Sequence, residues 1–172
     1  MDLKSTIREV PDFPKEGISF KDITTLLKDA EALKQTIDEL SNMAKDMKVD
    51  IVVGPEARGF ILGTAIAYKL GAGFVPIRKP GKLPYKTIKQ NYFLEYGEDS
   101  LEIHKDAIEP GQNVLIIDDL LATGGTLNST AKLIENLKGN VVGIFTLIEL
   151  TELDGISKLE AYNVKSLIKY PY

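Results

Sequence analysis

Two adjacent aspartates, Asp118 and Asp119, follow a run of four apolar residues at positions 114–117. A short segment containing Gly124 and Gly125 then leads into a stretch with helical apolar spacing. A glycine loop at the start of a helix directs backbone N–H groups and the positive end of the helix dipole toward an anion, usually a phosphate. Carboxylates repel a phosphate, but they accept hydrogen bonds from vicinal sugar hydroxyls or bind a divalent cation. The segment therefore predicts a site for a phosphorylated ribose.

The same segment has a purely structural interpretation, in which the aspartates end a strand and the glycines form a turn. Burying two carboxylates among apolar residues is unfavourable unless something compensates their charge. The neighbouring Thr123 and Thr126 also add hydroxyl donors to the loop. We therefore favour the ligand-binding interpretation.

Basic residues that suit a diphosphate occur at two other places. Arg58 lies in a turn between Gly54 and Gly59, where a guanidinium can make bidentate bonds to a diphosphate. Segment 78–89 contains five basic residues and no acid, although the whole chain has a net charge of −4. These five are Arg78, Lys79, Lys82, Lys86 and Lys89. We expect Arg78 and Lys82 to bind the diphosphate, and Lys86 and Lys89 to be solvated.

The apolar patterns place these residues in an alternating series of helices and strands. We expect helices over 30–48, with Asp29 as N-cap, over 59–70 and over 126–138, and strands over 49–53, 73–77, 113–117 and 141–148. The alternation predicts an α/β fold with a parallel sheet. In such sheets ligands bind beyond the carboxyl ends of the strands, so Arg58 and Asp118 should lie at the same edge.

Two stretches do not fit the alternation. Residues 78–112 carry turn signals and two strand-like pieces, 92–96 and 101–104, which predicts a long loop and a hairpin inserted between core strands. Residues 11–25 are rich in Pro and Gly but include large apolar side chains such as Phe20. We expect this segment to pack over another part of the molecule.

Composition limits the class of protein further. With 172 residues, 44% of them apolar and 27% charged, the chain suits a single globular domain over 1–172. It has no cysteine and one histidine, which excludes disulfides, thiolate zinc sites, cysteine nucleophiles and all-histidine metal sites. The acidic net charge argues against nucleic-acid and membrane-surface binding. The sequence contains neither an apolar span of about 20 residues nor a secretory leader, so we expect a cytoplasmic protein.

Segment 118–126 resembles the motif with which type I phosphoribosyltransferases bind phosphoribosyl diphosphate (PRPP). Further stretches resemble the same family in the same order, at 13–23, 54–60, 78–84, 94–97, 105–108 and 147–151. Together they cover nearly the whole chain and are most similar to the family members that act on adenine. The resemblance implies a parallel twisted sheet flanked by helices, with a flexible hood formed by about 1–25 and 78–110. It also implies a purine salvage reaction in which adenine and PRPP give AMP and diphosphate.

The resemblance implies roles for individual residues. Asp118 and Asp119 would bind the ribose, and Ala122, Thr123, Gly124, Gly125 and Thr126 the 5-phosphate. Arg58, Arg78, Lys79 and Lys82 would bind the diphosphate, while Phe20 and the backbone around Ser19 and Lys21 would bind adenine. Glu95 would act as catalytic acid or base, with Arg58 and Tyr96 assisting. The peptide bond Glu56–Ala57 would be cis.

The resemblance further implies Mg²⁺ and a homodimer. Because Mg²⁺ favours phosphate oxygens and water over cages made only of protein, we expect PRPP and diphosphate to hold it and assign it no protein ligand.

Two other functions remain open from the sequence. One is a phosphoribosyltransferase for hypoxanthine, guanine or xanthine, against which Ala122 argues, since related enzymes for 6-oxopurines tend to carry an aspartate there. The other is a PRPP-sensing regulator without catalysis, which would be expected to carry a DNA-binding module and to lack Glu95. A purely structural protein is the weakest interpretation.

Overall fold

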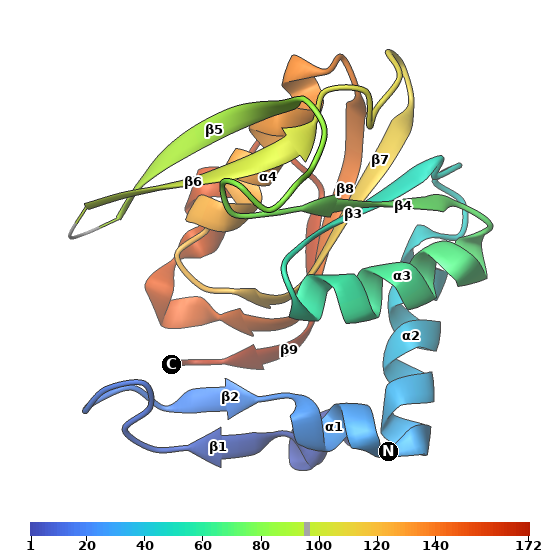
Figure 1. Ribbon diagram of the computed structural model, residues 1–172. Helices are drawn as coiled ribbons and strands as arrows, with labels where there is room; N and C mark the ends of the chain where they lie inside the picture. The colour runs from blue at the N-terminus through green and yellow to red at the C-terminus, as the bar shows by residue number, and fades with distance from the viewer. Residues whose placement is uncertain (95–96) are drawn as a thin grey trace.

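The computed structural model describes residues 1–94 and 97–172 (Figure 1). In chain order its elements are a 3₁₀ turn at Leu3–Thr6, β1 Arg8–Val10, β2 Phe20–Asp22, α1 Thr24–Lys28, α2 Ala30–Ala44, β3 Ile51–Pro55, α3 Arg58–Leu70, β4 Gly73–Ile77, β5 Thr87–Leu94, β6 Gly97–His104, β7 Asn113–Leu121, α4 Gly125–Asn136, β8 Asn140–Leu150, 3₁₀ turns at Thr151–Leu153 and Gly155–Leu159, and β9 Val164–Tyr170. No helix in this described part of the chain is both long enough and apolar enough to span a membrane.

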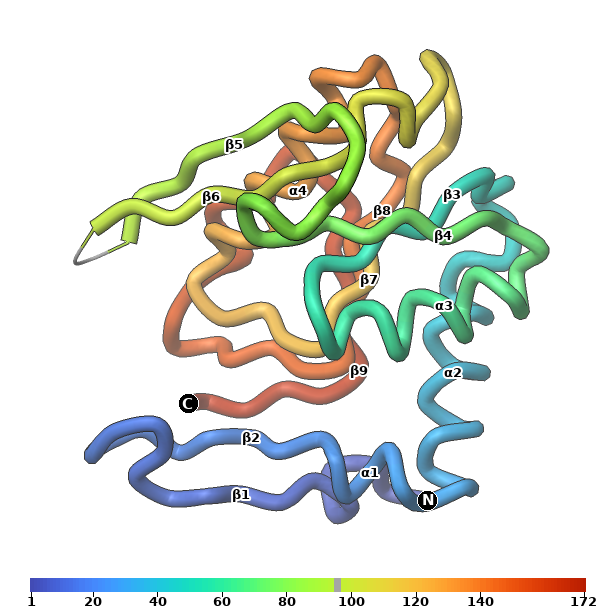
Figure 2. Tube along the Cα trace, in the orientation of Figure 1, coloured from blue at the N-terminus to red at the C-terminus, as the bar shows by residue number. Residues whose placement is uncertain are grey.

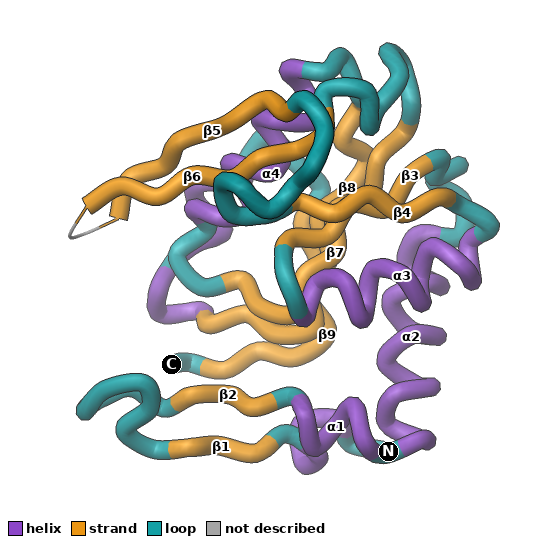
Figure 3. Tube along the Cα trace, viewed as in Figure 1, coloured by secondary structure: helices purple, strands orange, loops and turns teal. Residues whose placement is uncertain are grey.

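A five-stranded parallel sheet in the order β4-β3-β7-β8-β9 forms the centre of the fold. Its strands are rich in Val and Ile because helices cover both faces, α2 and α3 on one side and α4 on the other (Figure 3). In β7, Leu115 packs toward α2 and α3, whereas Ile116 packs toward α4. This alternation follows from the two-residue period of a strand. The predicted α/β sheet is confirmed.

The strand β7 is longer than predicted, and this changes the setting of the two aspartates. The sequence pattern ended the strand at Ile117, but its pairing with β8 continues as far as Leu121. The eleven-residue β8 supplies partners along the extra length, with Asp118 opposite Thr146. Asp118 and Asp119 are therefore part of a strand and not of the loop that follows it.

The N-terminal segment forms a separate two-stranded hairpin, β1–β2. It runs along the β9 edge of the main sheet (Figure 2). The edge strand β9 was not predicted, because its sequence VKSLIKY mixes basic and apolar residues. The predicted helix over 30–48 begins at Ala30 with Asp29 as N-cap, as expected, and the Asp29 side chain accepts from two backbone N–H groups. It ends at Ala44, earlier than predicted.

The inserted segment forms the antiparallel hairpin β5–β6, paired from Thr87 with His104 to Leu94 with Gly97. It is longer than the two predicted pieces, and the end of the first piece lies outside the described residues. Two backbone hydrogen bonds between Arg78 and Glu102, of 3.0 and 2.7 Å, attach the end of β4 to β6. The hairpin therefore has a fixed connection to the segment that carries the predicted diphosphate residues.

The cap of α2 provides a test of the fold. Asp29 Oδ1 accepts from the N–H groups of Glu31 and Ala32, both at 3.0 Å. We expect Asp29→Ala to lower the free energy of unfolding by about 1 kcal/mol and Tm by about 2–4 °C, without changing activity. Calorimetry measures the shift. The exposed Asp46→Ala, just past the end of the helix, is the control and should leave Tm unchanged; equal shifts in both variants would contradict the capping role.

Candidate active site

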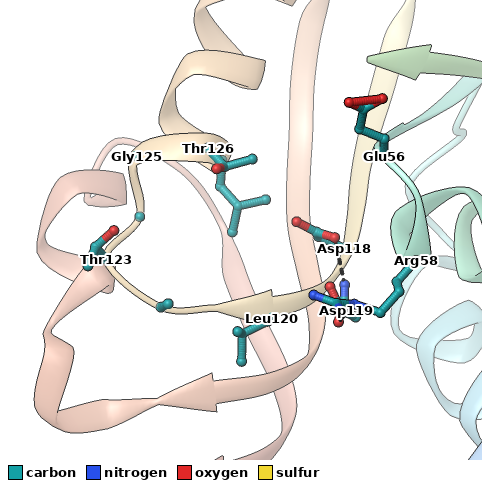
Figure 4. A pocket seen from close by; sticks show the side chains of 11 residues that line it. Glu56, Arg58, Asp118, Asp119, Leu120, Thr123, Gly125 and Thr126 are labelled. Carbon is teal, nitrogen blue, oxygen red and sulfur yellow. Dashed lines mark hydrogen bonds and ion pairs between the residues drawn. The ribbon is translucent and has the colours of Figure 1, made fainter. Parts of the chain in front are cut away.

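A cavity of about 220 Å³ opens at the carboxyl edge of the sheet between β3 and β7 (Figure 4). Its lining comes from three segments: the turn after β3, the end of β7 and the loop before α4. The lining residues are Glu56, Arg58, Asp118, Asp119, Leu120 and 122–127. The structure thus brings together the predicted ribose and 5-phosphate residues, with Arg58 at the same edge as expected.

The loop before α4 depends on a glycine. Gly124 has a φ of +88°, and a Cβ added there would lie 2.5 Å from the carbonyl oxygen of Gly155. Only glycine satisfies both conditions without moving the backbone. The loop leads into α4 at Gly125, so the first N–H groups of the helix border the cavity. Free N–H groups at a helix start bind anions, which suits a phosphate.

Both carboxylates are nearly inaccessible: Asp118 is 8% exposed and Asp119 is 5% exposed. Asp118 Oδ1 accepts a hydrogen bond of 2.8 Å from the N–H of Asp119. Asp119 Oδ2 lies 2.5 Å from Arg58 Nε. Burial, and then the negative charge of Asp119, raise the pKa of Asp118 well above its usual value. The pair therefore favours a ligand that donates hydrogen bonds to the carboxylates or brings positive charge next to them.

Arg58 reaches Asp119 because the turn after β3 lies very close to β7. A Cβ on Gly59 would be 3.1 Å from Asp118 Oδ1, and one on Gly54 would be 2.5 Å from the carbonyl oxygen of Gly59. The peptide bond Glu56–Ala57 in this turn is cis, as the family resemblance predicted.

Glu56 is a functional candidate that the sequence analysis missed. Its Oε2 accepts from Arg78 Nε at 3.0 Å, and its Oε1 accepts from the N–H of Lys79 at 3.1 Å. It therefore connects the turn after β3 to the predicted diphosphate segment. The sequence did contain a signal for this role. Segment 78–89 has basic residues but no acid, and the turn after β3 supplies an acid, Glu56.

The predicted diphosphate residues occupy different environments. Arg78 is paired with Glu56, and Lys79 Nζ is paired with Asp99 of β6. Lys82 is exposed. The predicted catalytic residues Glu95 and Tyr96 lie outside the described residues.

A second cavity, also of about 220 Å³, adjoins the first and is more apolar. Ile18, Ser19, Phe20 and Lys21 form one wall, and Leu150, Leu153 and Tyr172 form another. It shares Arg58, Asp119, Leu120 and Ala122 with the first cavity. The Phe20 ring lies 5.5 Å from the guanidinium carbon of Arg58. A flat apolar ligand in this cavity would therefore be next to a sugar held by Asp119.

Comparison with known proteins agrees with this arrangement. The phosphoribosyl transferase domain model matches residues 20–169. The adenine phosphoribosyltransferase of Alkaliphilus metalliredigens is 66% identical over 170 residues, which are 99% of this chain and all of the relative. The chain belongs to the adenine phosphoribosyltransferase family. The type I fold and the resemblance found in the sequence are thereby confirmed.

Solved structures of this family superpose closely on the chain. The enzyme of Thermoanaerobacter pseudethanolicus has a TM-score of 0.96 at 57% identity, over 98% of each chain. The Saccharomyces cerevisiae enzyme has a TM-score of 0.90 at 40% identity, over 96% of each chain. That yeast structure is a complex with adenine and an imino-altritol bisphosphate.

Within 1–94 and 97–172, no group of three or more His, Asp or Glu side chains has the geometry of a metal site. Asp118 and Asp119 are the buried carboxylates of the cavity, and Asp119 is paired with Arg58. This donor set fits a Mg²⁺ ion held mainly by substrate oxygens and water.

Gly124→Ala tests the phosphate loop. The new Cβ would meet the Gly155 carbonyl, so we expect the loop to shift, the KM for PRPP to rise and kcat/KM to fall about 100-fold or more. Gly111→Ala is a matched control, because Gly111 has a φ of +87° and no atom within 4 Å of the added Cβ. Both variants should lose about 1–2 kcal/mol of stability to the backbone conformation. Equal kinetics in the two would contradict the role of the loop.

Asp118→Asn tests the strain of the carboxylate pair. Because the folded-state pKa of Asp118 lies above its unfolded value, the native state retains a proton that the unfolded chain releases, and stability falls as pH rises between the two values. Asn lacks this titration, so Tm should rise by about 2 °C or more near pH 7, and by less near pH 4. Calorimetry at both pH values measures the difference.

The same variant should lose function. If Asp118 accepts a hydrogen bond from the ribose, as the sequence predicts, removing its carboxylate should lower kcat/KM about tenfold or more. Asp106→Asn, at an exposed position, is the control and should change neither Tm nor kcat/KM. A Tm that falls near pH 7 would contradict the electrostatic interpretation of Asp118.

Proposed function

We propose that this chain transfers the 5-phosphoribosyl group of PRPP to adenine, giving AMP and diphosphate. The observation that carries the proposal is the pair of adjoining cavities, one bounded by a helix start and two carboxylates, the other by apolar side chains. A phosphate, a sugar and a flat base joined in that order match the order of these subsites. The adenine bound to the yeast relative supports the choice of base.

The polar cavity would position the phosphoribosyl group. We assign the 5-phosphate to the backbone N–H groups of 122–126 and to the hydroxyls of Thr123 and Thr126. The ribose 2- and 3-hydroxyls would donate to Asp118 and Asp119. This places the sugar carbon that reacts at the boundary of the two cavities, where the base can reach it.

The leaving diphosphate would be bound by basic residues from two segments. Arg58, Arg78, Lys79 and Lys82 would balance the charge that develops as the bond from the sugar to the diphosphate breaks. Mg²⁺ bound to the diphosphate would add further neutralisation of that charge. Glu56 would hold Arg78 in place. The hood, about 1–25 and 78–110, would exclude water from the oxocarbenium-like sugar.

The apolar cavity would bind the base. We assign Phe20 to stacking on adenine, and the backbone around Ser19 and Lys21 to its polar edge. Glu95 would exchange a proton with the purine, with Tyr96 closing the hood, as the family resemblance implies. The alternatives of a 6-oxopurine substrate and of a PRPP-sensing regulator are disfavoured by the family membership.

Three further properties are proposed on the same basis. We treat 1–172 as one domain, because the central sheet contains strands from both halves of the chain. A homodimer follows from the resemblance, and the exposed apolar side chains of Ile61 and Tyr68 on α3 support it. A chain without cysteine suits the reducing cytoplasm, which is the location that we propose.

Incubation with PRPP, Mg²⁺ and one of five nucleobases tests the activity. Measured as diphosphate release, kcat/KM for adenine should exceed that for hypoxanthine, guanine, xanthine or uracil by about 100-fold or more, because polar groups that fit an amino edge are left unpaired by an oxo edge. A reaction without base controls for PRPP hydrolysis. Preference for a 6-oxopurine, or no release with any base, would overturn the proposal.

A further inference from the structure

The side chain of Lys21 is a buried cation to which the proposed function gives no role. Its side chain is 2% exposed. Nζ donates to Glu9 Oε2 at 2.8 Å and to Ser19 Oγ at 2.9 Å, and it lies 4.7 Å from the centroid of the Tyr170 ring. A cation loses much of its hydration when it is buried, so it needs partners such as a carboxylate, a hydroxyl and an aromatic face. These contacts fix the position of Lys21 closely.

The position of Lys21 matters because no described strand of the main sheet pairs with its hairpin. Among the described residues, β1 and β2 form a ladder only with each other. The hairpin nevertheless lies along β9 and contributes Phe20 to the base cavity (Figure 1). Side-chain contacts must therefore set the distance between the hairpin and the sheet. The contact between Lys21 of β2 and Tyr170 of β9 spans this gap.

Tyr170 is also connected to the part of the cavity lining that Leu150 and Leu153 form. It pairs with Leu150 in the ladder of β8 and β9, and its carbonyl oxygen accepts from Thr151 Oγ1 at 3.2 Å. Leu150 and Leu153 line the same cavity as the hairpin residues 18–21. Tyr170 itself is only 4% exposed. Tyr170 thus contacts the hairpin through its ring and the Leu150–Thr151 segment through its backbone.

We propose that Lys21 and Tyr170 are positioning residues for base recognition, whose cation–π contact sets the spacing between Phe20 and the Leu150–Leu153 wall. That spacing decides whether a flat purine ring fits between the two. The proposal rests on the proposed function, and it concerns the side chain of Lys21, apart from any backbone contact to the base.

Lys4 provides a matched control on the same ring. Its Nζ lies 4.3 Å from the centroid of Tyr170 and donates to the carbonyl oxygen of Lys169 at 3.2 Å. Unlike Lys21, it is exposed and lies outside the hairpin that lines the cavity. Removing its charge changes the surroundings of Tyr170 without releasing Phe20.

Lys21→Met keeps the length of the side chain and removes its charge. The fold should tolerate this change, because the side chain of Glu9 is 55% exposed and regains water. We expect the KM for adenine to rise about tenfold, within the range that a desolvated cation–π contact supports, and the KM for PRPP to change less than twofold. Steady-state kinetics with each substrate varied in turn measures both constants.

Variants of Tyr170 and Lys4 complete the experiment. Tyr170→Leu should reproduce the selective effect, Tyr170→Phe should avoid it because the ring remains, and the double variant Lys21→Met/Tyr170→Leu should be no worse than either single one. Lys4→Met should stay within twofold of the wild type for both substrates.

Two results would overturn the positioning role: an unchanged KM for adenine in Lys21→Met, or equal rises in KM for adenine and PRPP. If Lys21→Met does not fold, the comparison of Tyr170→Leu with Tyr170→Phe decides the same question. Activity of the wild-type enzyme on adenine tests the proposed function separately, so failure of the two proposals can be distinguished.

Discussion

The ion pair between Arg58 and Asp119 is the interaction on which the site depends. Two neighbouring carboxylates are buried at the end of β7, and their repulsion together with burial raises the pKa of Asp118. Arg58 offsets this from the turn after β3, at 2.5 Å from Asp119. It reaches that position because glycines let the turn approach β7 closely. A ligand that donates hydrogen bonds to both carboxylates relieves the same repulsion. The pair therefore lowers the folding stability of the free protein but favours ligand binding.

The basic residues assigned to the diphosphate follow a related rule. Arg58, Arg78 and Lys79 each have an acidic partner in this structure: Asp119, Glu56 and Asp99. A diphosphate would share these three cations with their acidic partners and would not meet isolated cations. This arrangement explains how a chain with net charge −4 can present a cationic pocket without leaving like charges uncompensated. Because ion pairs of partly exposed side chains are weak, sharing these cations with a diphosphate would cost little free energy.

How much the sequence could predict follows from the range of the interactions involved. The alternation of helices and strands, the cap at Asp29 and the glycine loop at Gly124 depend on local patterns and were predictable. The extension of β7 to Leu121 depends on its pairing with β8, and the formation of the edge strand β9 depends on its pairing with β8 as well. These contacts join segments that are distant in sequence, so local patterns did not predict them. Glu56 and the Lys21–Tyr170 contact were missed because their partners are distant in sequence. The roles of Glu95 and Tyr96 come from the resemblance alone.

The two cavities differ in how the fold builds them. The cavity that we propose for phosphate and ribose is made by the ends of β3 and β7 and the start of α4, elements that pack in the core. The base subsite takes one wall from the β1–β2 hairpin, which side chains hold against the sheet. A change in the hairpin can therefore alter the choice of base while leaving the core and the phosphate subsite intact. Under the proposed function, base recognition would therefore depend in part on an element outside the sheet.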